Sequence, residues 1–222
     1  MPLSITLSFI GEGTTDDRFI PNISERLIKQ LLIEQNREAT IIEWKSIYKT
    51  GENFVEIMLN AAIEAKSSTT LIVHCDADNT TAHNVIQTKI QPGIDAIANY
   101  KDECCRSITV VIPISETEAW MLVDKDLLKE EMNTALSNHD LGLTYQLNKI
   151  EKIAKPKRKI EDAIDFHHQS LSRKRRKSAV TIGELYEPIS QQIELEKLEV
   201  LESFKSFKEN LINALKGEHI LN

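Results

Sequence analysis

Acidic side chains follow three apolar runs of this sequence, with types and spacings that suit a divalent cation. Glu12 lies between two glycines, and Asp76 and Asp78 come directly after an apolar run. Glu116 and Glu118 follow a later run. Mg²⁺ and Mn²⁺ prefer carboxylate oxygens as ligands, and paired ions offset charge on the attacking and leaving oxygens of phosphoryl transfer. These residues therefore indicate a metal-dependent site for phosphoryl transfer.

Each of these carboxylates also has a plainer interpretation. The pair Asp76 and Asp78 has the residue types of a turn that caps the next helix, and Glu12 suits an exposed loop. Glu118 has, with Ser115, the spacing of a helix-capping box. A shared site is favoured because all three acidic groups are expected at the same edge of one sheet.

Four apolar runs rich in β-branched residues predict the strands of that sheet. The runs are Ser4–Ile10, Ala39–Ile47, Thr69–Cys75 and Ser107–Ile114. Amphipathic segments between them predict helices, and Thr14 with Asp17 has the spacing of a capping box that would open the first one. The alternation predicts a mostly parallel sheet covered on both faces. Because ligands bind outside the carboxyl ends of such strands, the acidic residues should meet there.

The sequence after about residue 126 has helical periodicity, high charge and no obvious strand. No linker rich in Gly and Ser separates this half from the first. We therefore expect a core over residues 1–125 and a helical extension over residues 126–222 packed on it. The helices expected in the extension are Leu127–Ser137, Lys157–Ser170, Thr181–Ile193 and Leu198–Leu215.

Positive charge is concentrated in one stretch of an acidic chain. The net charge is −7, whereas residues 152–177 carry a net charge of +7. Lys157 follows a proline and is a candidate to present its ammonium to a phosphate; a solvated lysine at a helix start is the alternative. Five consecutive basic residues suit sequence-independent contacts with a nucleic-acid backbone, and a solvated loop is the alternative for them. They are Arg173, Lys174, Arg175, Arg176 and Lys177.

Composition disfavours several classes of protein. The three cysteines make no disulfide framework, and no C-x-x-C pair suggests a zinc site. No apolar window is long enough to span a membrane, and no basic segment precedes an apolar run at the N-terminus. We therefore expect a cytoplasmic protein without membrane association. No Walker A loop is present, so any ATP hydrolysis would come from another chain.

Four further residues are expected to have structural roles. Asp17 and Asp124 suit helix-terminus charges. His74 lies within a buried run and Trp120 near the start of a helix, so both are expected to be satisfied core residues.

Three segments of the chain together resemble the Toprim family, namely Glu12–Asp16, His74–Asn79 and Ser115–Trp120. The likeness is to small Toprim-like proteins, related to the nuclease half of overcoming-lysogenization-defect proteins, that accompany ATPases in bacterial anti-phage defence loci. Asp16 replaces the usual glutamate of the first segment. Lys155–Lys157 resembles the family's Pro-Lys turn, and Glu187 stands where many relatives carry a lysine.

The resemblance implies a four-stranded, mostly parallel Toprim-like sheet and a Mg²⁺- or Mn²⁺-dependent nuclease acting on DNA or RNA. It makes Glu12 a general acid or base or a metal ligand, and Asp76 and Asp78 metal ligands. It further implies an antiviral defence role with a partner ATPase. The residues that would complete or tune a second metal site are Asp16, Glu116 and Glu118.

Two other functions remain open at this point. One is a non-catalytic Toprim-like module that senses a phage component or docks on an ATPase. The other is a phosphotransferase or primase-like enzyme that uses the same metal chemistry. The sequence leaves the choice between DNA and RNA, and the oligomeric state, homo-oligomers included, undecided.

Overall fold

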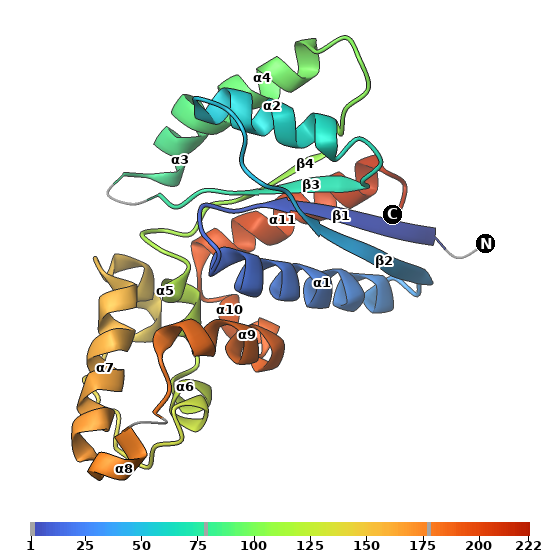
Figure 1. Cartoon of the computed structure of the whole chain (residues 1–222). Coiled ribbons are helices and arrows are strands. Elements are labelled where there is room, and N and C mark those ends of the chain that lie inside the picture. The colour runs from blue at the N-terminus through green and yellow to red at the C-terminus, as the bar shows by residue number, and fades with distance from the viewer. Residues whose placement is uncertain (1–2, 78–79, 177–178) are drawn as a thin grey trace.

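The computed structural model describes residues 3–77, 80–176 and 179–222 and shows an α/β fold built on one sheet (Figure 1). The strands pair in the order β2–β1–β3–β4, and every pairing is parallel. The predicted class, a mostly parallel sheet flanked by helices, is confirmed. The strands are β1 (Leu3–Ile10), β2 (Ala39–Ser46), β3 (Thr70–His74) and β4 (Ile108–Val111).

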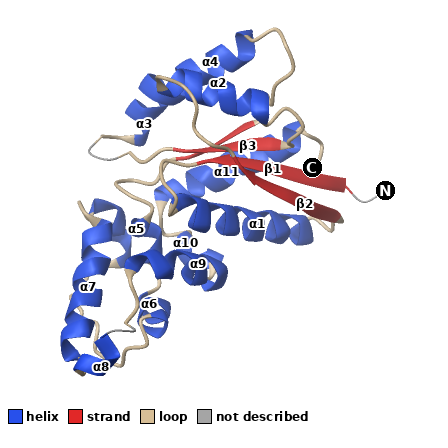
Figure 2. Cartoon of the chain, viewed as in Figure 1, coloured by secondary structure: helices blue, strands red, loops and turns tan. Residues whose placement is uncertain are grey.

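Helices cover both faces of the sheet (Figure 2). On one face lie α2 (Phe54–Glu64) and α4 (Gln91–Asn99), whose apolar side chains form one cluster with those of β3. On the other face lie α1 (Asp16–Glu34) and α11 (Glu202–Gly217). All five residues of β3 are buried, as expected for a central strand between two helical layers.

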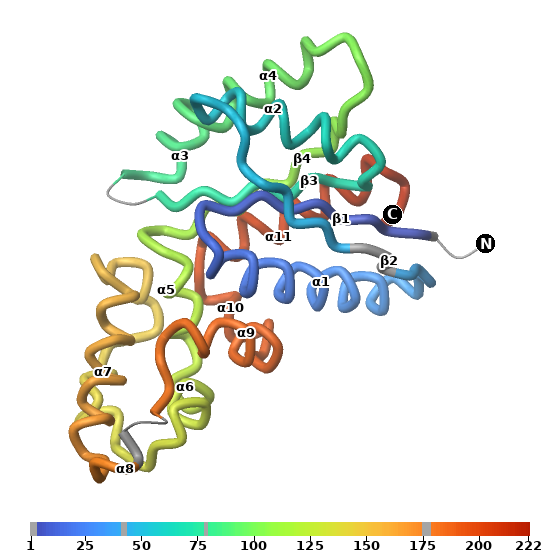
Figure 3. The backbone as a smooth tube through the Cα atoms, viewed as in Figure 1, coloured from blue at the N-terminus to red at the C-terminus, as the bar shows by residue number. Residues whose placement is uncertain are grey.

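The remaining helices lie mostly beyond the carboxyl ends of the strands (Figure 3). No helix within residues 3–77, 80–176 and 179–222 has the length and apolarity needed to cross a membrane. Between β3 and β4 the chain forms α3 (Ala82–Val85) and a π-helical turn (Ile86–Ile90) before α4. After β4 come α5 (Glu118–Met121), α6 (Lys125–Glu131), a 3₁₀ helix (Leu147–Lys152), α7 (Pro156–Ser170), α8 (Arg173–Arg176), α9 (Ile182–Gln192) and α10 (Leu195–Leu198).

The helices after residue 126 share one apolar core with the sheet. Tyr186 of α9 packs edge-on against Phe19 of α1, with ring centroids 6.5 Å apart. Trp120 is fully buried and packs edge-on against Phe204 of α11 at 5.4 Å, so its predicted place in the core is confirmed. The second half therefore packs on the sheet, and the boundary near residue 125 stays a prediction.

Three predictions in the second half are wrong in detail. The helix predicted over Leu127–Ser137 ends at Glu131, because Asn133 adopts the left-handed conformation that ends a helix (φ 50°). The helix predicted over Leu198–Leu215 begins only at Glu202, since Leu198 ends the preceding helix α10 and Leu201 is extended and buried. The loop predicted at the basic run begins with the single turn of α8, consistent with the helix propensity of Arg and Lys.

Candidate functional site

The loops that follow β1, β3 and β4 meet at one edge of the sheet, because these strands are neighbours and run in parallel. Thr117, in the loop after β4, joins the other two. Its hydroxyl donates a hydrogen bond to Oδ1 of Asp16 at 3.1 Å and lies 3.0 Å from Nε2 of His74. The expected meeting of the three chain segments is therefore present.

His74 is the buried centre of this polar group. Its Nε2 lies 3.4 Å from Oδ1 of Asp76, and its Nδ1 lies 3.5 Å from Oδ2 of Asp16. Because the single proton of Thr117 goes to Asp16, Nε2 of His74 donates to the Thr117 oxygen. Burial alone would lower the pKa of His74, but the carboxylates of Asp76, Asp16 and Glu12 together raise it above its ordinary value.

His74 lies in the core as predicted, but the prediction that its polar atoms are satisfied is wrong. It is fully buried, yet its Nδ1 has no hydrogen-bond partner among the residues that the structure describes. A sequence signal for its role was present, because residues two apart on a strand point to the same face. His74 and Asp76 have that spacing.

Asp16 opens α1 and holds the preceding loop. Its Oδ2 accepts a hydrogen bond from the amide of Gly13 at 2.8 Å, and its side chain is almost fully buried. The predicted capping box of Thr14 and Asp17 is wrong, since Thr15 is the N-cap and makes no side-chain capping bond. Asp17 lies in the first turn, where the helix dipole favours a negative charge, as predicted.

Glu12 projects from a tight turn at the end of β1. A Cβ at Gly11 would come within 2.8 Å of the Phe9 ring, so only glycine fits this close approach. The backbone oxygen of Glu12 accepts a hydrogen bond from Nζ of Lys49. Burial and the adjacent Glu12 carboxylate raise the pKa of the Cys75 thiol to about 12. The Glu12 side chain is thus exposed to solvent and close to the end of β3.

Asp76 carries a buried carboxylate oxygen without a matching donor. Its Oδ1 has no hydrogen-bond partner among the described residues, although Nε2 of His74 lies 3.4 Å away. Burial raises the pKa of Asp76, and nearby Asp16 and Glu12 act in the same direction against the opposing effect of His74. Buried polar atoms normally have partners, so this oxygen suits a cation. Asp78, predicted beside it, lies outside the described residues.

Glu116 and Glu118, in contrast, have partners from the second half of the chain. Oε2 of Glu116 accepts a hydrogen bond from the amide of Lys157 at 2.9 Å, at the start of α7. Oε1 of Glu118 accepts a hydrogen bond from the hydroxyl of Tyr186 and lies 3.7 Å from Nζ of Lys157. Burial raises the pKa of Glu118 despite the opposing effects of these two neighbours. Burial and the Glu118 carboxylate raise the pKa of Tyr186.

The capping role considered for Glu118 and Ser115 is not what the structure shows. Thr117 precedes α5 and makes no side-chain capping bond, and Ser115 has a positive φ of 71°. Glu118 instead reaches Tyr186, 68 residues away. Tyr186 was not assigned to the site by sequence reasoning, and neither was Thr117.

The basic candidates divide into one residue at the site and one distant segment. Lys157 lies at the first turn of α7, close to Glu118, with 45% of its side chain exposed. Arg173 and Lys174 are exposed on α8, beyond the opposite end of α7 (Figure 1). Since α7 has 15 residues, it separates the two places by about 22 Å. The side chains of Arg175 and Arg176, and all of Lys177, lie outside the described residues.

The donor chemistry suits a hard cation only in part. Within the described ranges, no group of three or more His, Cys, Asp or Glu side chains is arranged to hold a metal ion. Asp16, Glu116 and Glu118 accept hydrogen bonds from the protein. Glu12 and the partnerless oxygen of Asp76 are of the ligand type that Mg²⁺ takes. Among the described residues, these two are therefore the best suited to bind a divalent cation.

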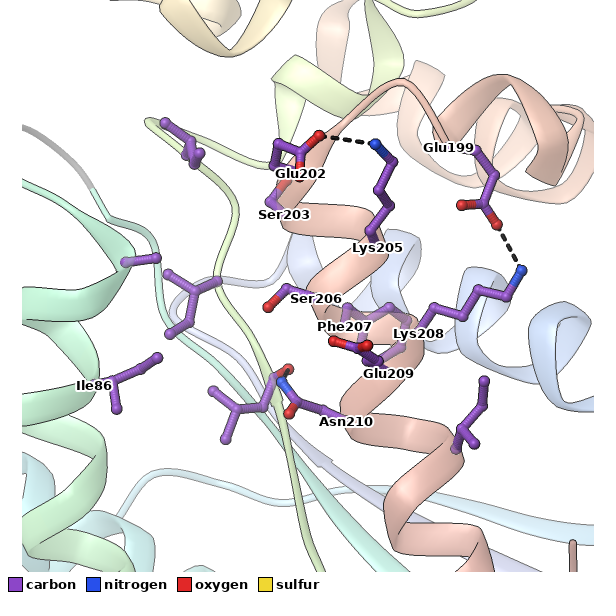
Figure 4. Close-up of a pocket in the computed structure, with 15 residues that line it drawn as sticks. Ile86, Glu199, Glu202, Ser203, Lys205, Ser206, Phe207, Lys208, Glu209 and Asn210 are labelled. Atoms are coloured by element: carbon purple, nitrogen blue, oxygen red, sulfur yellow. Dashed lines mark hydrogen bonds and ion pairs between the residues drawn. The ribbon is translucent and has the colours of Figure 1, made fainter. Parts of the chain in front are cut away.

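A hollow of about 580 Å³ lies away from these carboxylates. It follows α11 and the open side of β4, with Ile86 across from it (Figure 4). Its lysines are already paired: Lys205 with Glu202 and Lys208 with Glu199. None of the predicted site residues lines it, so size alone does not mark the site.

Two smaller hollows adjoin Glu12. One, of about 210 Å³, is lined by Glu12, Lys49 and His74 among others. The other, of about 300 Å³, lies between the Gly11–Thr14 loop and residues 46–49.

Comparisons of the chain with protein-family models, curated proteins and solved structures find no match. Any assignment of function therefore rests on this geometry and on the sequence motifs.

Proposed function

We propose that this protein is a metal-dependent nuclease with a four-stranded Toprim-type sheet. The observation that carries the proposal is the buried Oδ1 of Asp76, which accepts no hydrogen bond and has the His74 imidazole 3.4 Å away, at an edge where three strand ends bring carboxylates. Metal-assisted hydrolysis of a phosphodiester uses a cation and a general base at one place. Glu12 and Asp76 supply the matching side chains, with Asp78 two residues after Asp76 in the sequence.

The residues of the site divide the work in this proposal, and Glu12 has two tasks. Glu12, Asp76 and Asp78 would hold Mg²⁺ or Mn²⁺, which would supply a water of lowered pKa and offset charge on the phosphate. His74 and Thr117 orient the carboxylates of Asp16 and Asp76 through the contacts described above. Glu12, exposed at the opening, accepts the proton of the attacking water. A second ion near Asp16, Glu116 and Glu118 would have to displace their present hydrogen bonds.

Nucleic acid is the substrate class that this chemistry favours. Lys157 reaches the edge of the site and can place its ammonium against a phosphate. The basic run Arg173–Lys177 would contact the backbone of a long substrate at a distance from the site. By the motif resemblance, we further propose a cytoplasmic defence effector that works with a partner ATPase.

A non-catalytic sensor or docking module is the second candidate. One observation favours it: Asp16, Glu116 and Glu118 are hydrogen-bonded within the protein, and the bonds of Glu116 and Glu118 tie the helical half to the sheet. In that case the acidic residues serve structure and regulation. The candidates differ in whether cations promote hydrolysis.

A cleavage assay with the variant Glu12→Gln tests the proposal. Labelled single-stranded and duplex DNA and RNA are incubated with the protein and Mg²⁺ or Mn²⁺, with EDTA as the blank. We expect cation-dependent cleavage that falls by at least about 10²-fold in Glu12→Gln, because loss of a general base costs this much. Affinity for the nucleic acid should stay close to that of the wild type. Glu103→Gln, which changes an exposed glutamate on the loop before β4, is the matched control.

Two results would overturn the proposal. If Glu12→Gln cleaves as fast as wild type and Glu103→Gln, Glu12 has no catalytic role. If wild type binds nucleic acid or an ATPase but cleaves nothing with either cation, the docking module is the better account.

A further inference from the structure

The loop between β2 and α2 presents an aromatic ring and an ammonium beside Glu12. Tyr48 is 85% exposed, the most exposed of the large hydrophobic side chains described. Lys49 follows it and donates from Nζ to the backbone oxygen of Glu12. The hydrophobic clusters of the described residues do not include the Tyr48 ring, so its faces are open to a ligand.

This loop is held in place by contacts on both sides of Tyr48. The amide of Ile47 donates to the backbone oxygen of Phe9 at 2.8 Å, which extends the pairing of β1 and β2. Asn60 of α2 donates from its side chain to the backbone oxygen of Thr50 at 2.8 Å. A ring on a tethered loop loses little conformational entropy when it binds a flat ligand, so Tyr48 suits a binding platform.

A hollow of about 300 Å³ separates this platform from the end of β1. Its walls are Tyr48 and Lys49 on one side and the Gly11–Thr14 loop on the other. This volume is at the lower end of the range for small-molecule sites and suits one nucleotide unit. Lys49 has three donors and uses one on Glu12, so two remain for a phosphate.

The charges at the hollow explain why an aromatic ring would be needed. Glu12 and Asp17 line it together with Lys49, so carboxylates outnumber the ammonium. Without a cation, this balance gives a polyanion little electrostatic attraction. Stacking of a base on an aromatic ring contributes about 1–3 kcal/mol per base and does not depend on the charge of the site.

We propose that Tyr48 and Lys49 form a substrate subsite that stacks one unpaired base and holds the adjoining phosphate beside Glu12. The subsite takes single-stranded DNA or RNA, because the faces of bases in a duplex are covered by their neighbours. This inference rests on the proposed nuclease function for the purpose of the subsite, while its binding step is measured independently of cleavage.

Binding to a fluorescein-labelled single-stranded oligoadenylate, in deoxy and ribo forms, tests the subsite by anisotropy. EDTA is present so that cleavage cannot interfere. We expect Tyr48→Ala to weaken binding of the single strand by about 5- to 150-fold and to leave binding of the duplex form unchanged. Tyr48→Phe should restore the single-strand affinity, because the ring is kept. Lys49→Gln should lower the slope of log affinity against log salt by about 0.7, the value for one phosphate of a single strand.

Phe166 on α7 provides the matched control, because it is also an exposed aromatic residue, at 45%. Phe166→Ala should bind the single strand as wild type does. The proposal is overturned if Tyr48→Ala binds the single strand like wild type, if it weakens single-strand and duplex binding equally, or if wild type has no measurable affinity for the single strand.

The outcome also separates the subsite from the nuclease proposal. If the protein binds the single strand through Tyr48 but cleaves nothing, the subsite is supported and the nuclease proposal is rejected. If the protein is a cation-dependent nuclease but its Tyr48→Ala variant binds the single strand normally, the nuclease proposal is supported and the subsite is rejected. The ribo and deoxy arms identify which of the two strands is preferred.

Discussion

The ends of β3 and β4 carry carboxylates in opposite situations. After β3, Asp76 has a buried oxygen without a hydrogen-bond partner, and His74 next to it has a buried nitrogen in the same condition. After β4, Glu116 accepts a hydrogen bond from the amide of Lys157, and Glu118 accepts one from the hydroxyl of Tyr186. Both regions are acidic and lie at the same edge of the sheet.

This difference separates two uses of a buried charge. A carboxylate with a donor from a distant helix fixes that helix, and Glu118 and Glu116 hold α9 and α7 in this way. A carboxylate without one destabilises the fold, since an unpaired buried polar group costs about 1–3 kcal/mol. Such a cost at Asp76 is understandable if the oxygen has a ligand in the working protein.

The largest expected difference between the two regions is their response to a cation. A cation that binds only the folded state at 100 times its Kd stabilises by about 2.7 kcal/mol, or about 5–10 °C in Tm for a chain of this size. We expect this shift with Mg²⁺ or Mn²⁺ for wild type and Glu116→Gln, and its loss in Asp76→Asn. Thermal unfolding with and without the cation measures it. Equal shifts for all three proteins would remove Asp76 from the ligand set.

A smaller effect is expected from the contact between Tyr186 and Glu118. Tyr186→Phe leaves a buried carboxylate short of a donor, which should lower the free energy of unfolding by about 1–3 kcal/mol, with cleavage retained. Tyr145→Phe is the matched control, because its hydroxyl donates to the neutral backbone oxygen of Leu122 at 2.7 Å. Urea denaturation compares the two. A smaller cost for Tyr186→Phe than for Tyr145→Phe would contradict a structural role for Glu118.

The smallest effect concerns Asp124, a paired carboxylate remote from the site. It is the N-cap of α6, as its predicted helix-terminus role required, and its Oδ2 lies 2.7 Å from Nζ of Lys197. Burial alone would raise its pKa, but the Lys197 ammonium and the amide of Leu127 lower it below the ordinary value. Because the folded pKa is depressed, the stabilisation is present above about pH 4 and is lost as the pH falls through the folded pKa.

Asp124→Asn isolates this charge, since Asn caps a helix about as well as Asp. We expect it to cost up to about 1 kcal/mol at pH 7, because Lys197 is partly exposed. The difference from wild type should become smaller in acid, and cleavage should not change. Urea denaturation at pH 7 and at about pH 3 measures both values. A cost that persists unchanged in acid would show that the charge is not its source.

The sequence pattern predicts the alternation of strands and helices along the chain and the edge of the sheet at which acidic residues gather. Continuous apolar runs such as that of β3 are needed by a strand buried on both faces, so Thr69–Cys75 could be recognised without a structure. The alternation with helices then required parallel pairing, which put Glu12 and Asp76 at one edge. These inferences use only neighbours in the chain and the rules of chain connection.

The partners of the carboxylates depend on tertiary packing. Asp16 has a local donor, the amide of Gly13, but its other donor, Thr117, is 101 positions away, and the donor to Glu118, Tyr186, is 68 positions away. Capping patterns describe hydrogen bonds within about one helical turn, so they misassigned Glu118 to Ser115. A buried carboxylate takes the donor that the packed fold brings to it, because leaving it unpaired costs more than a local cap gains. The same packing left Oδ1 of Asp76 without a donor, and no local pattern in the sequence records that.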